Sequence, residues 1–105
     1  MSYKIIYTKK FSEQLDTCLN YLEKAFSKKV AEDFFHEIDE CKQDLLSFPY
    51  LGIVPSFDLL KKKNLRALIS KHSIIFYEVN EQIQTIIFYA FTSSKQDYIN
   101  CIKVN

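Results

Sequence analysis

The first half of the chain carries one β-type run followed by a helical stripe of apolar residues. Residues 2–7 are rich in Ile and Tyr and contain no Gly or Pro, which predicts a short strand. Thr8 is suited to the N-cap of a helix that runs to about Phe26, because apolar residues recur there with a period of about 3.6 residues. This stripe consists of Phe11, Leu15, Cys18, Leu19 and Leu22.

A second helical stripe begins directly after the first. Ser27 is suited to its N-cap, and the helix must end before Pro49, because the residue before a proline is pushed out of the α region. Two helices joined by so short a link are expected to pack as antiparallel neighbours. The second stripe consists of Val30, Phe34, Ile38, Cys41 and Leu45.

The second half of the chain is dominated by β-type runs. Residues 48–60 hold the only Gly and both Pro residues, so they are expected to form an irregular crossing from helix to sheet. Strands are predicted at residues 64–70, 74–79 and 85–91, with turns at 71–73 and 80–82 and a last short helix at 94–103. The order is β-α-α-β-β-β with a helical tail. It predicts an α+β fold in which a helical hairpin packs on one face of an antiparallel sheet.

Length and composition fit one domain spanning residues 1–105. The hydrophobic fraction of 48% is enough to form a core without metals or disulfides. The longest apolar run falls well short of the roughly 20 residues that span a bilayer, and residues 1–4 lack the apolar region of a secretory signal. We therefore expect a cytoplasmic protein without a membrane partner.

The sequence predicts neither a cofactor nor a metal site. It contains no phosphate-binding loop, no dinucleotide fingerprint and no nucleophile elbow. Its three cysteines, at positions 18, 41 and 101, lie far apart and have no His at zinc spacing. We expect them to be reduced thiols that behave as small apolar residues.

The two halves of the chain differ in charge. Residues 1–60 carry seven Lys against ten Asp and Glu, a net −3, whereas residues 61–105 carry six Lys and one Arg against three acidic residues, a net +4. The C-terminal half is therefore the half expected to meet an anionic partner.

Four motifs in this order resemble the RelE/ParE family of toxins from bacterial toxin–antitoxin pairs. They are Tyr-Lys-Ile-Ile-Tyr at 3–7, Phe-Pro-Tyr-Leu-Gly at 48–52, Asn-Leu-Arg-Ala-Leu at 64–68 together with Phe-Tyr-Glu-Val at 76–79, and Ser-Lys-Gln-Asp-Tyr at 94–98. The resemblance runs along nearly the whole chain. It implies the fold predicted above and a cognate antitoxin that wraps the toxin and blocks its working surface.

The resemblance leaves two molecular targets open. RelE-like members are ribosome-dependent endoribonucleases that cut messenger RNA, whereas ParE-like members share the fold but poison DNA gyrase without hydrolysing anything. A third hypothesis is a degenerate toxin that retains only antitoxin binding. If the chain is an enzyme, it is expected to be a metal-independent ribonuclease.

Arg66 is the main candidate for a catalytic residue, as the group that would hold a phosphate. The resemblance aligns it with the arginine of the family's Arg-x-Leu strand, and a guanidinium can hold a phosphate through two parallel hydrogen bonds. We expect Arg66 on the sheet face away from the helices, where it would be needed for toxicity but not for antitoxin binding. The alternative is a structural role, as an ion pair with a helix carboxylate or as hydrogen bonds to backbone carbonyls.

Other cations and acid–base groups lie in the same half. Lys61, Lys62, Lys63 and Lys71 are candidates for binding the target or a nucleic acid, although adjacent lysines also suit a solvated loop. Lys95 and Tyr98 belong to the tail motif, where they are tentative catalytic residues; Tyr98 equally suits a core anchor.

Neither of the two histidines is expected to take part in catalysis or binding. His72 is expected to be an exposed, idle imidazole in a tight turn, although its ordinary pKa suits acid–base chemistry. His36 is expected on a solvated helix face together with Asp33, Glu37, Asp39 and Glu40.

Departures from the nuclease pattern favour the gyrase-binding hypothesis. The nuclease relatives usually carry Tyr-Arg where this chain has Ser73-Ile74, and often a cation in the segment filled here by residues 92–94. Loss of these cations removes several kcal/mol of transition-state stabilisation unless other groups replace them. A toxin that acts by binding needs no such set.

Overall fold

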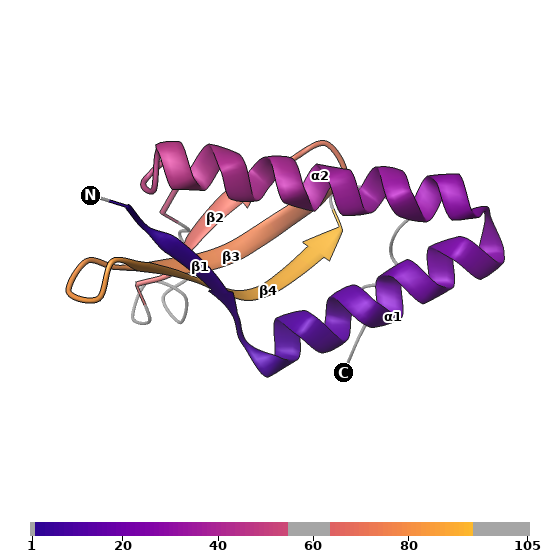
Figure 1. Cartoon of the computed structure of the whole chain (residues 1–105), viewed down its shortest axis with the longest axis horizontal. Helices are drawn as coiled ribbons and strands as arrows, with labels where there is room; N and C mark the ends of the chain where they lie inside the picture. The colour runs from indigo at the N-terminus through magenta and orange to yellow at the C-terminus, as the bar shows by residue number, and fades with distance from the viewer. Residues whose placement is uncertain (1, 55–63, 94–105) are drawn as a thin grey trace.

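The computed structural model describes residues 2–54 and 64–93, and these form two helices and a four-stranded sheet (Figure 1). In chain order the elements are β1 (Lys4–Tyr7), α1 (Lys9–Ala25), α2 (Lys28–Ser47), β2 (Arg66–Ile69), β3 (Ser73–Asn80) and β4 (Thr85–Ser93). The predicted α+β fold and its β-α-α-β-β-β order are confirmed. The helix expected at residues 94–103 lies outside the described residues.

Side-chain caps begin both helices at the predicted positions. The Thr8 hydroxyl oxygen accepts a hydrogen bond from the Phe11 backbone N–H at 3.1 Å, and the hydroxyl donates to the Tyr89 carbonyl at 2.8 Å. Ser27 caps α2 by accepting from the Val30 backbone N–H at 3.1 Å. Thr8 thus ties the start of α1 to β4, whereas Ser27 lets α2 begin immediately after the first helix ends.

The sheet is mixed, with strand order β1-β4-β3-β2. The pairs β2–β3 and β3–β4 are antiparallel, but β1 pairs in parallel with β4, so that Ile5 lies opposite Ile86. The expectation of a wholly antiparallel sheet is therefore wrong for β1. The two helices carry the chain across the sheet and back, and the three-strand meander then places its last strand, rather than its first, beside β1.

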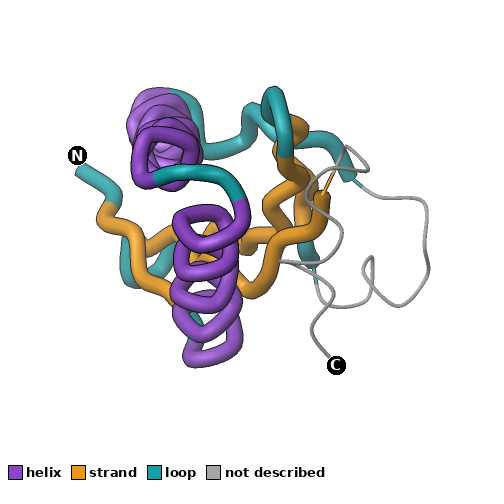
Figure 2. The backbone as a smooth tube through the Cα atoms, turned by 90° about the vertical axis from the view of Figure 1, so that its right-hand side faces the viewer, coloured by secondary structure: helices purple, strands orange, loops and turns teal. Residues whose placement is uncertain are grey.

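Both helices cover one face of the sheet, and the core lies between the two layers (Figure 2). Phe11 of α1 stands at its centre: its ring centroid lies 5.3 Å from that of Phe88 and 5.2 Å from that of Phe91, both on β4. The two predicted helical stripes supply the helical side of this core, with Leu19 and Val30 only partly buried. Residues of β3 alternate between buried and half-buried positions, as expected for a strand covered on one face.

The cysteines differ from the sequence expectation in one respect. Cys41 is a buried free thiol, and burial raises its pKa. Cys18, fully buried in the core, is disulfide-bonded, so the expectation of a reduced thiol is wrong for this position. The wide spacing of the cysteines along the sequence did not indicate a disulfide at Cys18.

Candidate functional site

Two of the predicted site residues, Arg66 and Lys71, lie in the part of the chain that the structure describes. Arg66 is the first residue of β2, and Lys71 lies in the turn that follows this strand. The remaining predicted site residues lie outside the described ranges: Lys61, Lys62, Lys63, Lys95 and Tyr98.

The β2–β3 register places Arg66 on the helix-facing side of the sheet. Arg66 lies directly opposite Tyr77, which is fully buried in the core beneath the helices. Directly opposed residues of an antiparallel pair project to the same face. The expectation that Arg66 lies on the open face is therefore wrong. A shift of one residue in the pairing of a strand moves each of its side chains to the opposite face of the sheet. The short β2 has no alternation of apolar and polar residues that would have predicted the register.

The Arg66 guanidinium is held by the segment that follows α2. Its Nη1 donates to the Gly52 carbonyl at 2.8 Å and to the Tyr50 carbonyl at 3.4 Å. Its Cζ lies 4.9 Å from the centroid of the Tyr50 ring, within range of a cation–π interaction worth about 0.5–2 kcal/mol. Hydrogen bonds to backbone carbonyls, one of the alternatives for Arg66, are thus present.

Tyr77 anchors this segment from inside the core. Its hydroxyl donates to the Pro49 carbonyl at 3.0 Å and accepts from the Gly52 backbone N–H at 2.8 Å. Burial raises the pKa of Tyr77, so the phenol remains a neutral donor at neutral pH. Ile53 and Ala67 then exchange two backbone hydrogen bonds, of 2.9 and 2.8 Å, which extend the sheet beyond β2.

Arg66 lines a cavity of about 290 Å³ that also contains a carboxylate and apolar walls. Glu78 lines the same cavity, and its Oε1 accepts from the Tyr89 hydroxyl at 2.8 Å. The Tyr50 hydroxyl donates to Glu81, and this hydrogen bond, more than desolvation, raises the pKa of Tyr50 to about 12. Both nearby carboxylates are therefore bound by tyrosines rather than by Arg66.

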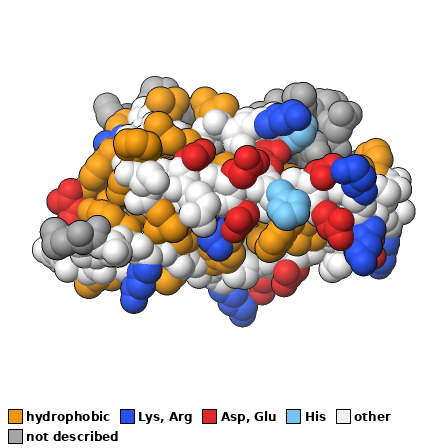
Figure 3. Space-filling model, turned by 45° about the horizontal axis from the view of Figure 1, so that its top comes forward, with side chains coloured by type: hydrophobic (Ala, Val, Ile, Leu, Met, Phe, Trp, Pro, Cys, Tyr) orange, Lys and Arg blue, Asp and Glu red, His pale blue; other side chains and the backbone are white. Residues whose placement is uncertain are grey.

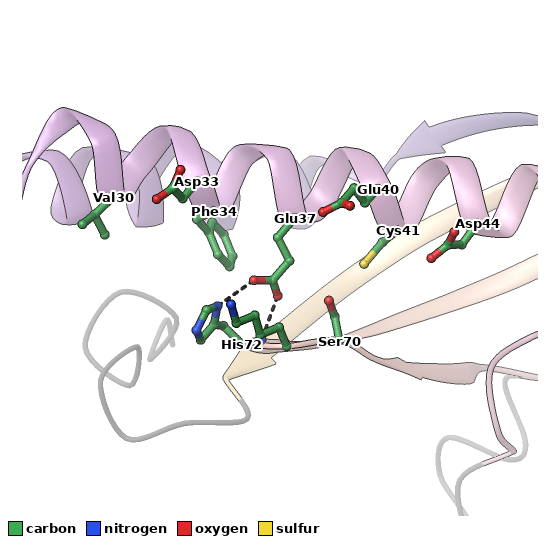
Figure 4. A pocket seen from close by; sticks show the side chains of 10 residues that line it. Val30, Asp33, Phe34, Glu37, Glu40, Cys41, Asp44, Ser70 and His72 are labelled. Atoms are coloured by element: carbon green, nitrogen blue, oxygen red, sulfur yellow. Dashed lines mark hydrogen bonds and ion pairs between the residues drawn. The ribbon is translucent and has the colours of Figure 1, made fainter.

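A second constellation joins α2 to the β2–β3 turn, and Figure 4 shows Glu37 reaching from the helix to His72. One carboxylate oxygen lies 2.7 Å from His72 Nδ1; the other accepts from the His72 backbone N–H at 2.8 Å and from the Ser73 hydroxyl at 3.1 Å. The Glu37 side chain is 10% exposed and that of His72 is 23% exposed. The expectations of an idle, exposed His72 and a solvated Glu37 are both wrong.

A cavity of about 430 Å³ lies beside this constellation, between α2 and the turn. Its helix wall carries Asp33, Glu40 and Asp44 around the apolar Phe34 and Cys41, and Lys71 lines the sheet side. Figure 3 shows acidic side chains gathered around the histidines on this face of the molecule. His36 is exposed, as expected.

Arg66 and His72 do not converge on one site. Arg66 is paired with Tyr77, whereas His72 directly precedes Ser73, so five residue steps along β3 separate the two positions, or roughly 16 Å at about 3.3 Å per residue. Within the described ranges, no group of three or more His, Cys, Asp or Glu residues is placed to hold a metal ion. The described helices also include none that is long and apolar enough to cross a membrane.

Sequence reasoning missed Glu37, Tyr50 and Tyr77 as positioning residues. A signal for Glu37 was present, because it lies three residues after Phe34 and one before Ile38, and therefore beside the buried stripe. Tyr77 stands in an apolar run where only its hydroxyl distinguishes it from its neighbours. No local pattern connected Tyr50 with Arg66.

The fold and sequence were compared with those of known proteins. No curated protein matches the chain by sequence. A solved structure described as the chromosomal ParDE TA system from P. aeruginosa matches with a TM-score of 0.69 and 14% identity, over 89% of this chain and 97% of that one. At this identity the match shows a shared fold.

A comparison with models of protein families identifies the family itself. The model described as the ParE toxin of type II toxin-antitoxin system, parDE, matches residues 5–98. The matched range includes both helices, all but the first residue of β1 and the whole of the other strands. This chain belongs to the family of ParE toxins of type II toxin–antitoxin systems.

Proposed function

We propose that the chain inhibits bacterial growth by binding DNA gyrase without itself hydrolysing a substrate, and that a cognate antitoxin holds it inactive in the cytoplasm. Membership of the ParE toxin family over residues 5–98 carries this proposal. The family establishes a toxin of a type II pair, and the choice of gyrase follows from the resemblance and from the arrangement of the described side chains.

The described residues offer no set of groups suited to RNA cleavage. Metal-free cleavage requires a base, a phosphate-binding cation and an acid around one scissile bond. Arg66 and His72 lie roughly 16 Å apart along the sheet, at about 3.3 Å per residue, and His72 Nδ1 is engaged by Glu37. Ser73, at a position where nuclease relatives carry tyrosine, also binds Glu37. These contacts favour a toxin that acts by binding.

The segment that follows α2 offers a surface for the antitoxin. Large apolar side chains that are 46–66% exposed cluster in residues 48–54, beside the outer edge of β2. Contiguous exposed apolar surface of this kind marks sites of protein association. The exposed residues of this segment are Phe48, Tyr50, Leu51, Ile53 and Val54.

Cations of the C-terminal half are the proposed contacts with the target. They are Lys61, Lys62, Lys63 and Lys71. Lys71 is exposed beside the turn, and the other three precede β2 in the sequence. Arg66, Lys95 and Tyr98 have a catalytic role only under the nuclease alternative.

Induction of the chain in bacteria, with and without co-expressed antitoxin, tests this proposal. We expect growth arrest with a DNA-damage response, intact messenger RNA and co-purification of gyrase with the toxin, all suppressed by the antitoxin. Translation arrest with cut messages would instead establish a RelE-like ribonuclease. Normal growth at full expression of the folded chain would indicate a degenerate toxin, and either result would overturn the proposal.

A further inference from the structure

We propose that the Arg66 cavity is a receptor for a single carboxylate side chain, Glu or Asp, presented by an apolar segment of a protein partner. The inference rests on the proposed function in one respect only, which is that the antitoxin is the partner. Four features carry it: the geometry of Arg66, the engagement of the neighbouring acids, the local charge and the apolar walls.

The guanidinium is held with one edge engaged and the other available. Nη1 donates to the backbone carbonyls of Tyr50 and Gly52, and Cζ lies 4.9 Å from the centroid of the Tyr50 ring. Nε and Nη2 have no hydrogen-bond partner among residues 2–54 and 64–93. That edge of a guanidinium matches the two oxygens of a carboxylate. Because folding has already immobilised the Arg66 side chain, this side chain loses less conformational entropy when a partner binds.

Within the described part of the chain, no carboxylate binds Arg66. Glu78 lines the same cavity but accepts the Tyr89 hydroxyl, and Glu81 accepts the Tyr50 hydroxyl. The chain thus places two carboxylates near its only arginine and binds each of them to a tyrosine. The available edge of Arg66 is left for an acid from outside the described fold.

The local charge favours a carboxylate over a phosphate. Among the described residues, the cavity is lined by one cation, Arg66, and one carboxylate, Glu78, and a second carboxylate, Glu81, binds the lining residue Tyr50. A phosphate monoester near neutral pH carries between one and two negative charges, so these acids repel it more strongly than they repel a carboxylate. Val54 and Leu65 add apolar wall that suits the methylene stem of Glu. The exposed apolar segment 48–54 borders the cavity and provides a surface for the residues flanking that acid.

A titration followed through Arg66 itself provides the test. Because the chain contains one arginine, its ¹⁵N spectrum contains a single arginine Nε–H signal. The purified chain would be titrated at constant ionic strength and pH 6.5 with acetyl-Leu-Glu-Leu-amide, its Gln counterpart and inorganic phosphate. We expect a saturable shift with the Glu peptide and at least tenfold weaker effects with the other two.

Two variants define the site, and the backbone N–H of Ala67 reports binding when Arg66 is replaced. Arg66→Lys should weaken binding of the Glu peptide at least tenfold, because an ammonium lacks the planar pair of donors. Glu78→Gln should strengthen it several-fold by removing a like charge. An equal or larger response to phosphate would overturn the proposal in favour of nucleic-acid contact, and no response to any probe would also overturn it. The growth assay is independent, so loss of the gyrase hypothesis would leave this result intact.

Discussion

Glu37 shows how one residue joins the two layers of this fold. Its carboxylate accepts from the His72 backbone and the Ser73 hydroxyl and also contacts the His72 ring. A buried carboxylate is stable only when such donors compensate for its lost hydration. The three contacts fix the β2–β3 turn against α2. The cavity of about 430 Å³ lies between this turn and the helix.

Replacing Glu37 should therefore destabilise the domain substantially. Glu37→Ala removes the acceptor of a buried hydroxyl and a backbone N–H, with an expected loss of about 2–4 kcal/mol in the free energy of unfolding. Urea denaturation would measure the loss. Glu40→Gln, an exposed change on the same helix, is the matched control and should fall within about 0.5 kcal/mol of the parent. Equal midpoints for parent and Glu37→Ala would contradict the importance of these hydrogen bonds.

Tyr50 gives a prediction for alkaline pH. Its hydrogen bond to Glu81 raises the pKa to about 12, above the ordinary value of 10.0. Because the folded phenol binds its proton more tightly than the unfolded one, this contribution to stability is complete below about pH 10 and is lost as pH rises toward about 12.

NMR titration of the Tyr50 ring carbon that bears the hydroxyl would measure this pKa directly. In Glu81→Gln the acceptor is neutral, so the pKa of Tyr50 should fall back toward the ordinary range. Tyr89, whose pKa is raised by its own bond to Glu78, serves as the internal control and should not change. An unaltered Tyr50 pKa in Glu81→Gln would show that Glu81 is not the cause.

At the scale of elements, the segment after α2 behaves as an additional sheet edge rather than as a loose crossing. Ile53 pairs with Ala67 of β2, while Pro49 and Gly52 are bound by the Tyr77 hydroxyl. Gly52 is required by close approach: a Cβ there would lie 2.7 Å from the Tyr77 hydroxyl and 2.8 Å from the Ala67 carbonyl. The same close contact positions the Gly52 carbonyl for Arg66.

Gly52→Ala should thus disturb both stability and the Arg66 cavity. Forcing a methyl group against backbone and a buried hydroxyl is expected to cost about 1–3 kcal/mol. Thermal or urea unfolding would measure the cost, and the arginine Nε–H signal would shift because the Gly52 carbonyl that holds the guanidinium through Nη1 moves. Ser47→Ala, at the exposed end of α2, is the control. If Gly52→Ala left both the stability and the Nε–H signal at parent values, the space around Gly52 would not be what requires a glycine there.

At the scale of the whole molecule, charge is unevenly distributed. Helix α2 carries three Lys against six Asp and Glu, whereas residues 61–105 carry a net +4. An acidic partner would be attracted to the C-terminal half and repelled by the α2 face. Long-range attraction acts mainly on the rate of association, whereas apolar burial dominates dissociation.

Lys61, Lys62 and Lys63 should accordingly steer the antitoxin. Changing all three to Gln should lower the association rate and flatten its salt dependence, since screening acts over a Debye length of about 10 Å at 0.1 M. Stopped-flow mixing at several salt concentrations would measure both effects. Changing Lys24, Lys28 and Lys29 on the helices to Gln alters net charge equally and is the control. Equal salt slopes for parent and the 61–63 variant would assign those lysines to a solvated loop.

The helices and their order were decided by the sequence, because the information is local. Thr8 and Ser27 each cap a helix through an N–H three residues away, and the apolar stripes need only the geometry of successive helical turns. The β-α-α-β-β-β order and the family resemblance followed from such segments taken in series. Arg66 was recognised in the same way, as a residue in a motif.

Tertiary structure decided which segments meet. The position of β4 beside β1, and hence the parallel pair, depends on contacts between residues about 80 positions apart. The face occupied by Arg66 depends on its register with Tyr77, and the partners of Glu37 come from a turn 35 residues away. Local periodicity carries no information about such pairings, because they are selected by packing of the whole core. The carbonyls that hold Arg66 and the tyrosines that bind its neighbouring acids were for this reason visible only in the folded chain.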